Sequence, residues 1–117
     1  MPIEMKPGDV YLADTASGIR PAIIVSRPEL NNGKHVVAVL CTSTSFEMRS
    51  RFANCVPFRA GEFGFTKDCV AQAESITFIP TIDLHLDRGP FGILDETALR
   101  NVIRAIGFML DAECEPA

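Results

Sequence analysis

An arginine and a threonine at the ends of two neighbouring predicted strands are the most suggestive residues in the sequence. Arg20 begins one apolar run, Thr42 ends the next, and the turn residues Asn31 to Gly33 lie between the two runs. In an antiparallel hairpin, the first residue of one strand lies opposite the last residue of its partner. A guanidinium offers a rigid, permanently charged fork of donors and a hydroxyl adds a neutral one, which together suit a phosphate. The alternative is structural, with the arginine capping free carbonyls and the threonine closing a strand.

The common catalytic motifs do not occur in the sequence. It has no nucleophile elbow, glycine-rich phosphate loop, HExxH sequence or EF-hand loop. His35 and His85 belong to no catalytic pattern, and we interpret each as a surface or packing residue rather than a general base.

The cysteine pattern gives no indication of a metal site. The four cysteines are Cys41, Cys55, Cys69 and Cys114. None forms a CxxC pair, and no histidine lies near them at the spacing of zinc ligands. We therefore expect reduced, buried structural thiols, and we predict neither a metal nor a cofactor.

The net charge of −4 is unevenly distributed along the chain. Basic residues exceed acidic ones by four between Thr15 and Lys67, whereas acidic residues are in excess by six from Asp68 to Ala117. A basic middle and an acidic end permit a phosphate-bearing partner despite the overall sign. No apolar run approaches the roughly 18–20 residues of a membrane helix, and Met1 to Lys6 lacks the apolar core of a secretion signal. We therefore expect a cytoplasmic protein.

Short strands followed by one helix are predicted to position these residues. Alternation and turn signals predict strands at 9–14, 20–26, 35–42, 52–58, 68–73 and 76–79. Residues 43–51, rich in serine and arginine, are expected to form an exposed loop, and residues 80–90 an irregular segment with one helical turn.

The clearest predicted element is a helix near the end of the chain. Asp95 is placed to cap it, and an apolar stripe follows at a spacing of three to four residues. The residues of the stripe are Leu99, Val102, Ile103, Ile106 and Leu110. We predict a mainly β (α+β) fold, a small antiparallel barrel or strongly bent sheet with this amphipathic helix on one side. At 117 residues the chain is expected to be one domain (1–117), with a core at about 6–110 and a disordered tail at 111–117.

Four segments resemble, in their order and spacing, the MazF/PemK family of toxins. They are KPGDVYLAD at 6–14, RPAIIVS at 20–26, VVAVLCTST at 36–44 and KDCVAQAESITFI at 67–79. The predicted helix is similar to the closing helix of the family. The resemblance implies an SH3-like barrel that dimerises and cleaves single-stranded RNA without a metal. It also implies that the chain is the toxin half of a toxin–antitoxin pair and is inhibited by a protein antitoxin.

The resemblance also assigns roles to individual residues. In the family, the arginine of Arg-Pro and the threonine of Thr-Ser are usually held to act in catalysis, and they correspond to Arg20 and Thr42. The 2′-hydroxyl of the substrate attacks the adjacent phosphorus and leaves a 2′,3′-cyclic phosphate and a 5′-hydroxyl. Further substrate contacts are expected from Arg27, Ser43, Arg49, Arg51 and Glu74.

Two departures from the family pattern keep other functions open. The loop between the first two strands is cut to residues 15–19, and three residues after Glu74 replace the family's usual Gln, Arg and Thr. Glu62 and Glu74 are candidates for an additional acid or base. One alternative is a catalytically inactive RNA- or protein-binding member of the same fold. Another, by analogy of fold alone, is a gyrase-poisoning toxin.

Overall fold

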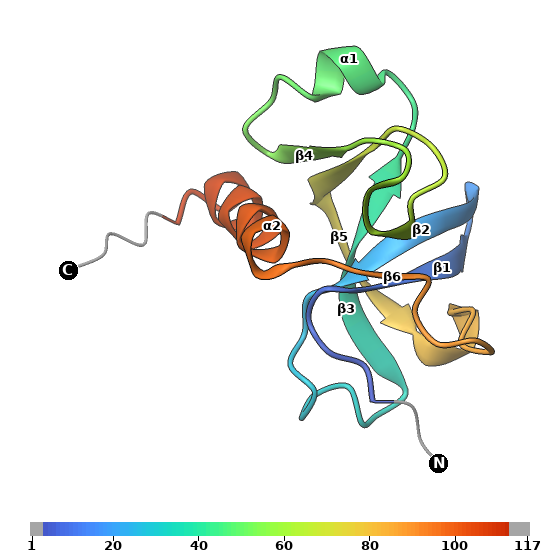
Figure 1. Cartoon of the computed structure of the whole chain (residues 1–117). Coiled ribbons are helices and arrows are strands. Elements are labelled where there is room, and N and C mark those ends of the chain that lie inside the picture. Colours follow the sequence, from blue (N-terminus) through green and yellow to red (C-terminus); the bar gives the residue numbers. More distant parts are fainter. Residues whose placement is uncertain (1–3, 113–117) are drawn as a thin grey trace.

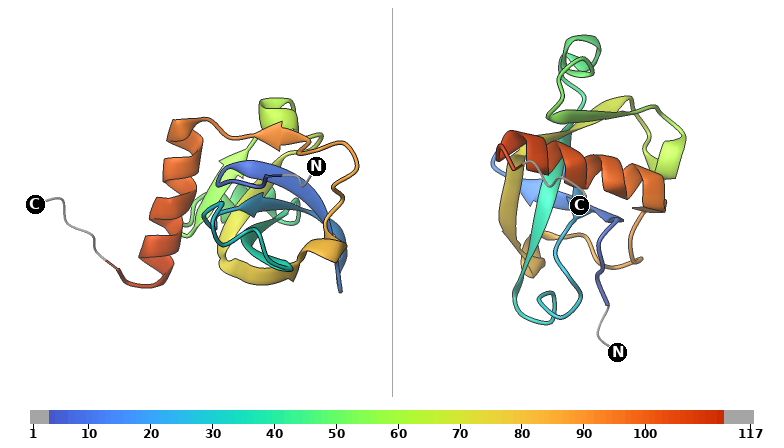
Figure 2. Two further views of the ribbon diagram at one scale, coloured as in Figure 1. Left: turned by 90° about the horizontal axis from the view of Figure 1, so that it is seen from below. Right: turned by 90° about the vertical axis from the view of Figure 1, so that its left-hand side faces the viewer.

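Six antiparallel strands form one curled sheet in the computed structural model, which describes residues 4–112 (Figure 1). Their spatial order is β4-β5-β3-β2-β1-β6. The strands are β1 (Asp9–Thr15), β2 (Gly18–Ile24), β3 (His35–Thr42), β4 (Cys55–Phe58), β5 (Cys69–Pro80) and β6 (Gly92–Ile93). The sheet curls into a half-barrel, and helix α2 (Glu96–Met109) lies along one flank (Figure 2). The predicted fold class, a mainly β SH3-like barrel with a C-terminal amphipathic helix, is confirmed.

The sheet is buried on both faces, because alternate side chains of its strands enter two hydrophobic clusters. Val10, Ile23 and Val39 are partners across three strands and belong to the cluster that also contains residues of α2. Tyr11 and Ile24 belong to the cluster on the other face. Burying each large apolar side chain stabilises the fold by about 1.5–3 kcal/mol. The two clusters explain why β3 is apolar along nearly its whole length.

Helix α2 begins at the predicted cap, where Asp95 Oδ1 accepts a hydrogen bond from the backbone N–H of Ala98 at 2.8 Å. Its buried residues are Ala98, Val102 and Ala105. Ile103 and Leu110 are 47% and 64% exposed, so the predicted stripe was wrong at these two positions. The buried face of α2 therefore consists mainly of small side chains, and Ala98 and Val102 pack into the hydrophobic cluster of the sheet. Within residues 4–112, no helix has the length and apolar character needed to cross a membrane.

Two predicted segments differ from the structure and a third agrees with it. Residues 43–51 are not wholly a loop, because they contain one helical turn, α1 (Phe46–Arg49). The strands predicted at 68–73 and 76–79 are one strand, β5, whose pairing with β3 shifts between Val39 and Cys41. Such an irregularity bends a strand without ending it. The helical turn predicted within 80–90 is the 3₁₀ turn η2 (Thr81–Asp83), and most of the predicted tail lies outside the described residues.

The connection between β2 and β3 is more than a tight turn. Asn31 is buried, and its Nδ2 donates hydrogen bonds to the carbonyl oxygens of Met5 at 2.8 Å and Ser26 at 2.9 Å. Its Oδ1 accepts a hydrogen bond from Ser26 Oγ, which in turn accepts one from the Val37 N–H at 3.0 Å. These bonds satisfy the whole amide and close this end of the sheet.

Candidate phosphate-binding site

A cavity of about 690 Å³ lies at the end of the sheet where β2 and β3 separate. The pairing of the two strands ends at Ala22 and Leu40. Continued by two residues, the same register sets Arg20 opposite Thr42, and both residues line the cavity. The polar residues of the lining are Ser17, Arg20, Thr42, Ser43, Thr44, Arg49, Thr66, Lys67 and Gln72.

Arg20 is anchored to the neighbouring strand through one of its nitrogens. Its Nε donates a hydrogen bond to the carbonyl oxygen of Cys41 at 2.9 Å. Within residues 4–112 this is the only hydrogen bond of the guanidinium, and no carboxylate there forms an ion pair with it. Because a guanidinium has five N–H donors, four remain for a ligand. The bond at Nε leaves both terminal nitrogens available for the oxygens of a phosphate.

Thr42 supplies a neutral donor to the same cavity. Its Oγ1 accepts a hydrogen bond from the backbone N–H of Thr44 at 3.2 Å. Serine and threonine commonly make such a bond where a strand passes into a turn. Accepting it leaves the hydroxyl hydrogen free to be donated to a ligand.

The cavity collects positive charge although the protein as a whole is acidic. Arg20, Arg49 and Lys67 line it, and no aspartate or glutamate is among its described lining residues. Lys67 and Gln72 were not predicted as site residues. Lys67 lies two residues before β5 begins, and Gln72 is a polar residue in the apolar first half of that strand. A polar position inside an apolar run was therefore the signal that could have identified Gln72.

Two cysteines give part of the lining an apolar character. Cys41 and Cys69 face the cavity, and hydrogen bonding to Cys69 together with burial raises the pKa of the Cys41 thiol well above its usual range. Such a thiol is a poor nucleophile at neutral pH. The predicted burial is confirmed for Cys41, Cys55 and Cys69, whereas Cys114 lies outside the described residues. Within residues 4–112, no three side chains of His, Cys, Asp or Glu are grouped so that they could hold a metal ion.

One wall of the cavity is fixed by contact between two backbones. A Cβ atom added to Gly64 would lie 2.3 Å from the carbonyl oxygen of Phe91. One added to Gly92 would lie 1.7 Å from the carbonyl oxygen of Phe63. Only glycine therefore allows the 3₁₀ turn η1 (Glu62–Gly64) to pack directly against β6.

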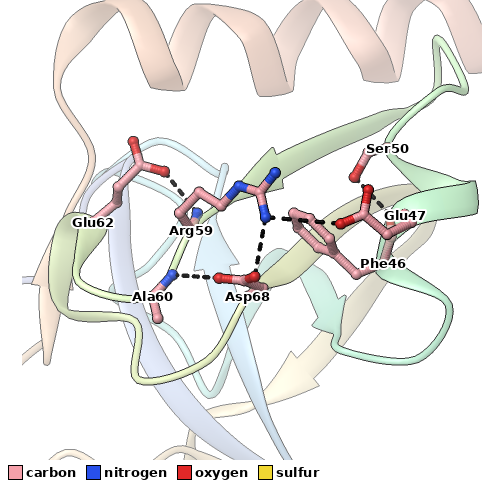
Figure 3. A network of polar contacts seen from close by, with 7 residues as sticks. All are labelled: Phe46, Glu47, Ser50, Arg59, Ala60, Glu62 and Asp68. Atoms are coloured by element: carbon pink, nitrogen blue, oxygen red, sulfur yellow. Dashed lines mark hydrogen bonds and ion pairs between the residues drawn. The ribbon is translucent and has the colours of Figure 1, made fainter.

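A polar network ties α1 to the start of β5 (Figure 3). Arg59 Nη1 lies 3.1 Å from Asp68 Oδ2 and 3.9 Å from Glu47 Oε1. The guanidinium also covers the ring of Phe46, 4.8 Å from its centroid. Exposed ion pairs of this kind are individually weak. Together they hold α1, and with it Arg49, beside the cavity.

Three of the predicted substrate-binding residues lie outside the cavity lining. Arg27 is exposed in the β2–β3 connection, and Arg51 is exposed after α1. Glu74 is exposed on β5, where it accepts a hydrogen bond from the side chain of Asn54 at 2.9 Å. Glu62, considered as an additional acid, is also outside the lining. The predicted residues that the cavity does bring together are Arg20, Thr42, Ser43 and Arg49.

Comparison with known families gives one match over most of the chain. The model of the family described as "PemK-like, MazF-like toxin of type II toxin-antitoxin system" matches residues 6–110. No curated protein sequence matches the chain significantly.

Several solved structures share the fold. The Mycobacterium tuberculosis toxin MazF-mt6 is 22% identical with a TM-score of 0.75, over 90% of this chain and 98% of that one. An endoribonuclease in complex with its cognate antitoxin, from a mycobacterial species, is 24% identical with a TM-score of 0.75, over 96% and 99%. MazF from Deinococcus radiodurans is 16% identical with a TM-score of 0.72, over 95% and 99%.

Proposed function

Since the chain belongs to the PemK-like, MazF-like toxin family of type II toxin–antitoxin systems, we propose that it is a metal-independent endoribonuclease acting on single-stranded RNA. The observation that carries this proposal is the cavity at the open end of β2 and β3, which three cations line together with no described carboxylate. A phosphodiester carries the charge that such a lining attracts.

Arg20 and Thr42 act on the phosphate that is cleaved. The 2′-hydroxyl attacks the adjacent phosphorus, a 2′,3′-cyclic phosphate forms, and the bond from phosphorus to the 5′-oxygen breaks. Negative charge then grows on the phosphoryl oxygens, where the free donors of Arg20 stabilise it. Because the Cys41 carbonyl already holds Nε, the guanidinium needs little rearrangement in the transition state. Thr42 donates its hydroxyl to the same phosphate, and the need for a 2′-hydroxyl restricts the reaction to RNA.

The rest of the lining suits the nucleotides on either side. Arg49 and Lys67 are placed for flanking phosphates, and the exposed Ser43 adds a further hydroxyl. Phe91, which is half-buried, also lines the cavity and offers aromatic surface to an unstacked base. Unstacked bases are a feature of single-stranded RNA, which is the substrate class we propose.

A protein antitoxin and a second copy of the chain are the proposed partners, in the cytoplasm. An acidic antitoxin segment complements the cations of the cavity and would exclude RNA from it. Ile103, Phe108 and Leu110 are large apolar side chains exposed on or directly after α2, and a second copy would cover them. Light scattering during gel filtration measures whether the particle has the mass of a dimer.

The test incubates the purified full chain with varied single-stranded RNAs in EDTA. We expect fragments that end in a 2′,3′-cyclic phosphate and begin with a 5′-hydroxyl, identified by mass spectrometry. Arg20→Ala should lower the rate by about 10²- to 10³-fold, because it removes the main charge stabilisation, while the circular dichroism spectrum is unchanged. Arg104→Ala, an exposed arginine on α2, is the matched control and should keep wild-type activity. Intact RNA in every wild-type reaction would rule out the enzyme.

A second candidate function is binding of RNA or protein without cleavage. Thr15 pairs with Gly18, so only a two-residue turn joins β1 to β2, and of these two residues only Ser17 lines the cavity. A shift of RNA on a native gel with no shortening of the RNA would establish this binder. Loss of DNA supercoiling with RNA left intact would instead indicate the gyrase-poisoning alternative.

A further inference from the structure

The proposed cleavage needs a proton for the departing 5′-oxygen, and the described lining of the phosphate cavity contains no histidine and no carboxylic acid. Proton transfer to a leaving group is efficient when the donor titrates near the working pH. A guanidinium such as that of Arg20 does not release its proton there. Glu62 and Glu74, the acids considered from the sequence, lie outside the lining.

A histidine–aspartate pair lies beside a second cavity that adjoins the first. This cavity has a volume of about 270 Å³, and Leu12 and Phe91 line both cavities. His85 lines the second one, and its Nε2 lies 2.8 Å from Asp14 Oδ1. The two side chains are 41% and 60% exposed, so a ligand can reach them. An ion pair as exposed as this one contributes little to the free energy of unfolding. A role in stabilising the fold therefore does not explain why the two residues are paired.

Strand β1 sets this pair close to Arg20. Ala13 pairs with Arg20 of β2 on one side and bridges Leu84 on the other. The backbones of Arg20 and Leu84 are therefore separated by two strand spacings, roughly 10 Å. The backbone N–H of His85 donates to the carbonyl oxygen of Leu12 at 2.8 Å, so the position of the histidine is fixed by β1.

Asp14 projects from the face of β1 that carries Leu12, whereas Arg20, the cross-strand partner of Ala13, starts from the opposite face. The two faces meet at the open end of the sheet, where Leu12 and Arg20 both line the phosphate cavity. The other charged residues that line the second cavity are Asp87 and Arg88, from the same segment as His85.

We infer that His85 is the general acid of the cleavage and that Asp14 positions it, an inference that rests on the proposed ribonuclease function. As the 2′-oxygen bonds to phosphorus, the electrons of the bond to the 5′-oxygen leave with that oxygen, which takes the Nδ1 proton of the imidazolium. The proton of the 2′-hydroxyl leaves to solvent water, and solvent then reprotonates the imidazole. Asp14 accepts the Nε2–H of the ring and thereby orients Nδ1.

The experiment compares ordinary RNA with RNA in which sulfur replaces the 5′-oxygen at the cleaved bond. A thiolate leaves without protonation, because thiols are far stronger acids than alcohols. His85→Ala should slow cleavage of ordinary RNA by about 10²-fold or more, but leave cleavage of the sulfur-containing RNA close to the wild-type rate. Arg20→Ala should slow both, because both substrates develop charge on the phosphoryl oxygens. His35→Ala, the matched control on the other described histidine, should change neither rate.

Two further variants separate proton donation from structure. His85→Gln can keep a hydrogen bond to Asp14 but has no proton to give, so it should be as slow as His85→Ala on ordinary RNA. Asp14→Asn should show a smaller loss that sulfur substitution also rescues. An active His85→Gln, or equal losses on the two RNAs, would overturn the inference, whereas a wild type that cleaves neither RNA would overturn the proposed function itself.

Discussion

The polar side chains at the two ends of the β2–β3 pair differ in how many of their hydrogen-bonding groups are used within the protein. At one end, Asn31 is 6% exposed, and its amide uses both hydrogens and its oxygen within the protein. At the other end, Arg20 uses one of five donors and Thr42 keeps its hydroxyl hydrogen free. A polar group whose hydrogen bonds are completed internally supports the fold, whereas an incomplete set beside a cavity indicates a binding site.

The largest effect that tests this comparison is expected from Asn31→Ala. It leaves the buried carbonyls of Met5 and Ser26 without a donor, so the free energy of unfolding should fall by about 2–4 kcal/mol. Arg20→Ala removes one hydrogen bond at a half-buried position and should lower it by about 1 kcal/mol or less. Urea unfolding followed by circular dichroism measures both. A loss of stability in Arg20→Ala that equals the loss in Asn31→Ala would show that the arginine is structural.

An intermediate effect is expected at Asp9, where hydrogen bonding is incomplete in a buried place. Its Oδ2 accepts from the Lys6 N–H at 3.1 Å, but its Oδ1 has no partner within residues 4–112. Burial raises the pKa of Asp9 above its ordinary value of 3.8. The neutral acid is thus favoured in the folded state. The resulting gain in the free energy of unfolding is complete below pH 3.8, and it is lost as the pH rises through the pKa that Asp9 has in the folded protein.

The variant Asp9→Asn removes the titration and keeps an acceptor for Lys6. The unfolding free energy of the variant, relative to that of the wild type, should therefore increase on going from acid to neutral pH. Urea unfolding at several pH values gives this difference. A difference that does not change with pH would contradict the expected effect of burial.

The smallest effect is expected where exposed ion pairs fix α1. Arg59→Ala should lower the unfolding free energy by less than about 1 kcal/mol, but should speed amide hydrogen exchange in α1 and lower RNA cleavage by displacing Arg49. Arg100→Ala breaks a similar exposed pair, with Glu96 on α2, and should change neither measurement. Unchanged exchange in α1 after Arg59→Ala would show that the helix is held by other contacts.

The same network has a predictable dependence on pH. A hydrogen bond from the Ala60 N–H and one from Arg59 lower the pKa of Asp68 below 3.8. The tether is therefore complete at neutral pH and is lost only as the pH falls through that lower value.

The fold and part of the site could be predicted because they depend on short-range order. Arg20 and Thr42 lie on strands that follow one another in the sequence, so counting residues from the intervening turn was sufficient to pair them. Arg27 and Arg51 were included for their charge alone. Charge does not specify on which side of a strand or helical turn a residue lies, and the structure sets both outside the cavity lining.

Other parts of the site depend on contacts between distant segments. His85 was interpreted as a surface or packing residue, because its partner Asp14 is 71 positions away in the sequence. His85 and Asp14 lie close together because Ala13 and Leu84 form a β-bridge, and no local sequence pattern predicts that bridge. Lys67 likewise reaches the cavity because the start of β5 pairs with the end of β3, where Val70 lies opposite Thr42.

The close contact of Gly64 and Gly92 has a consequence for how this protein can evolve. Their joint is made of main-chain atoms, so mutation of the surrounding side chains leaves the two facing surfaces unaltered. Glycine must be conserved at these two positions, whereas the other residues of this cavity wall can be substituted more freely. Descendants of this sequence can therefore exchange the residues that meet a ligand, and acquire a new preference, without rebuilding the architecture that holds them.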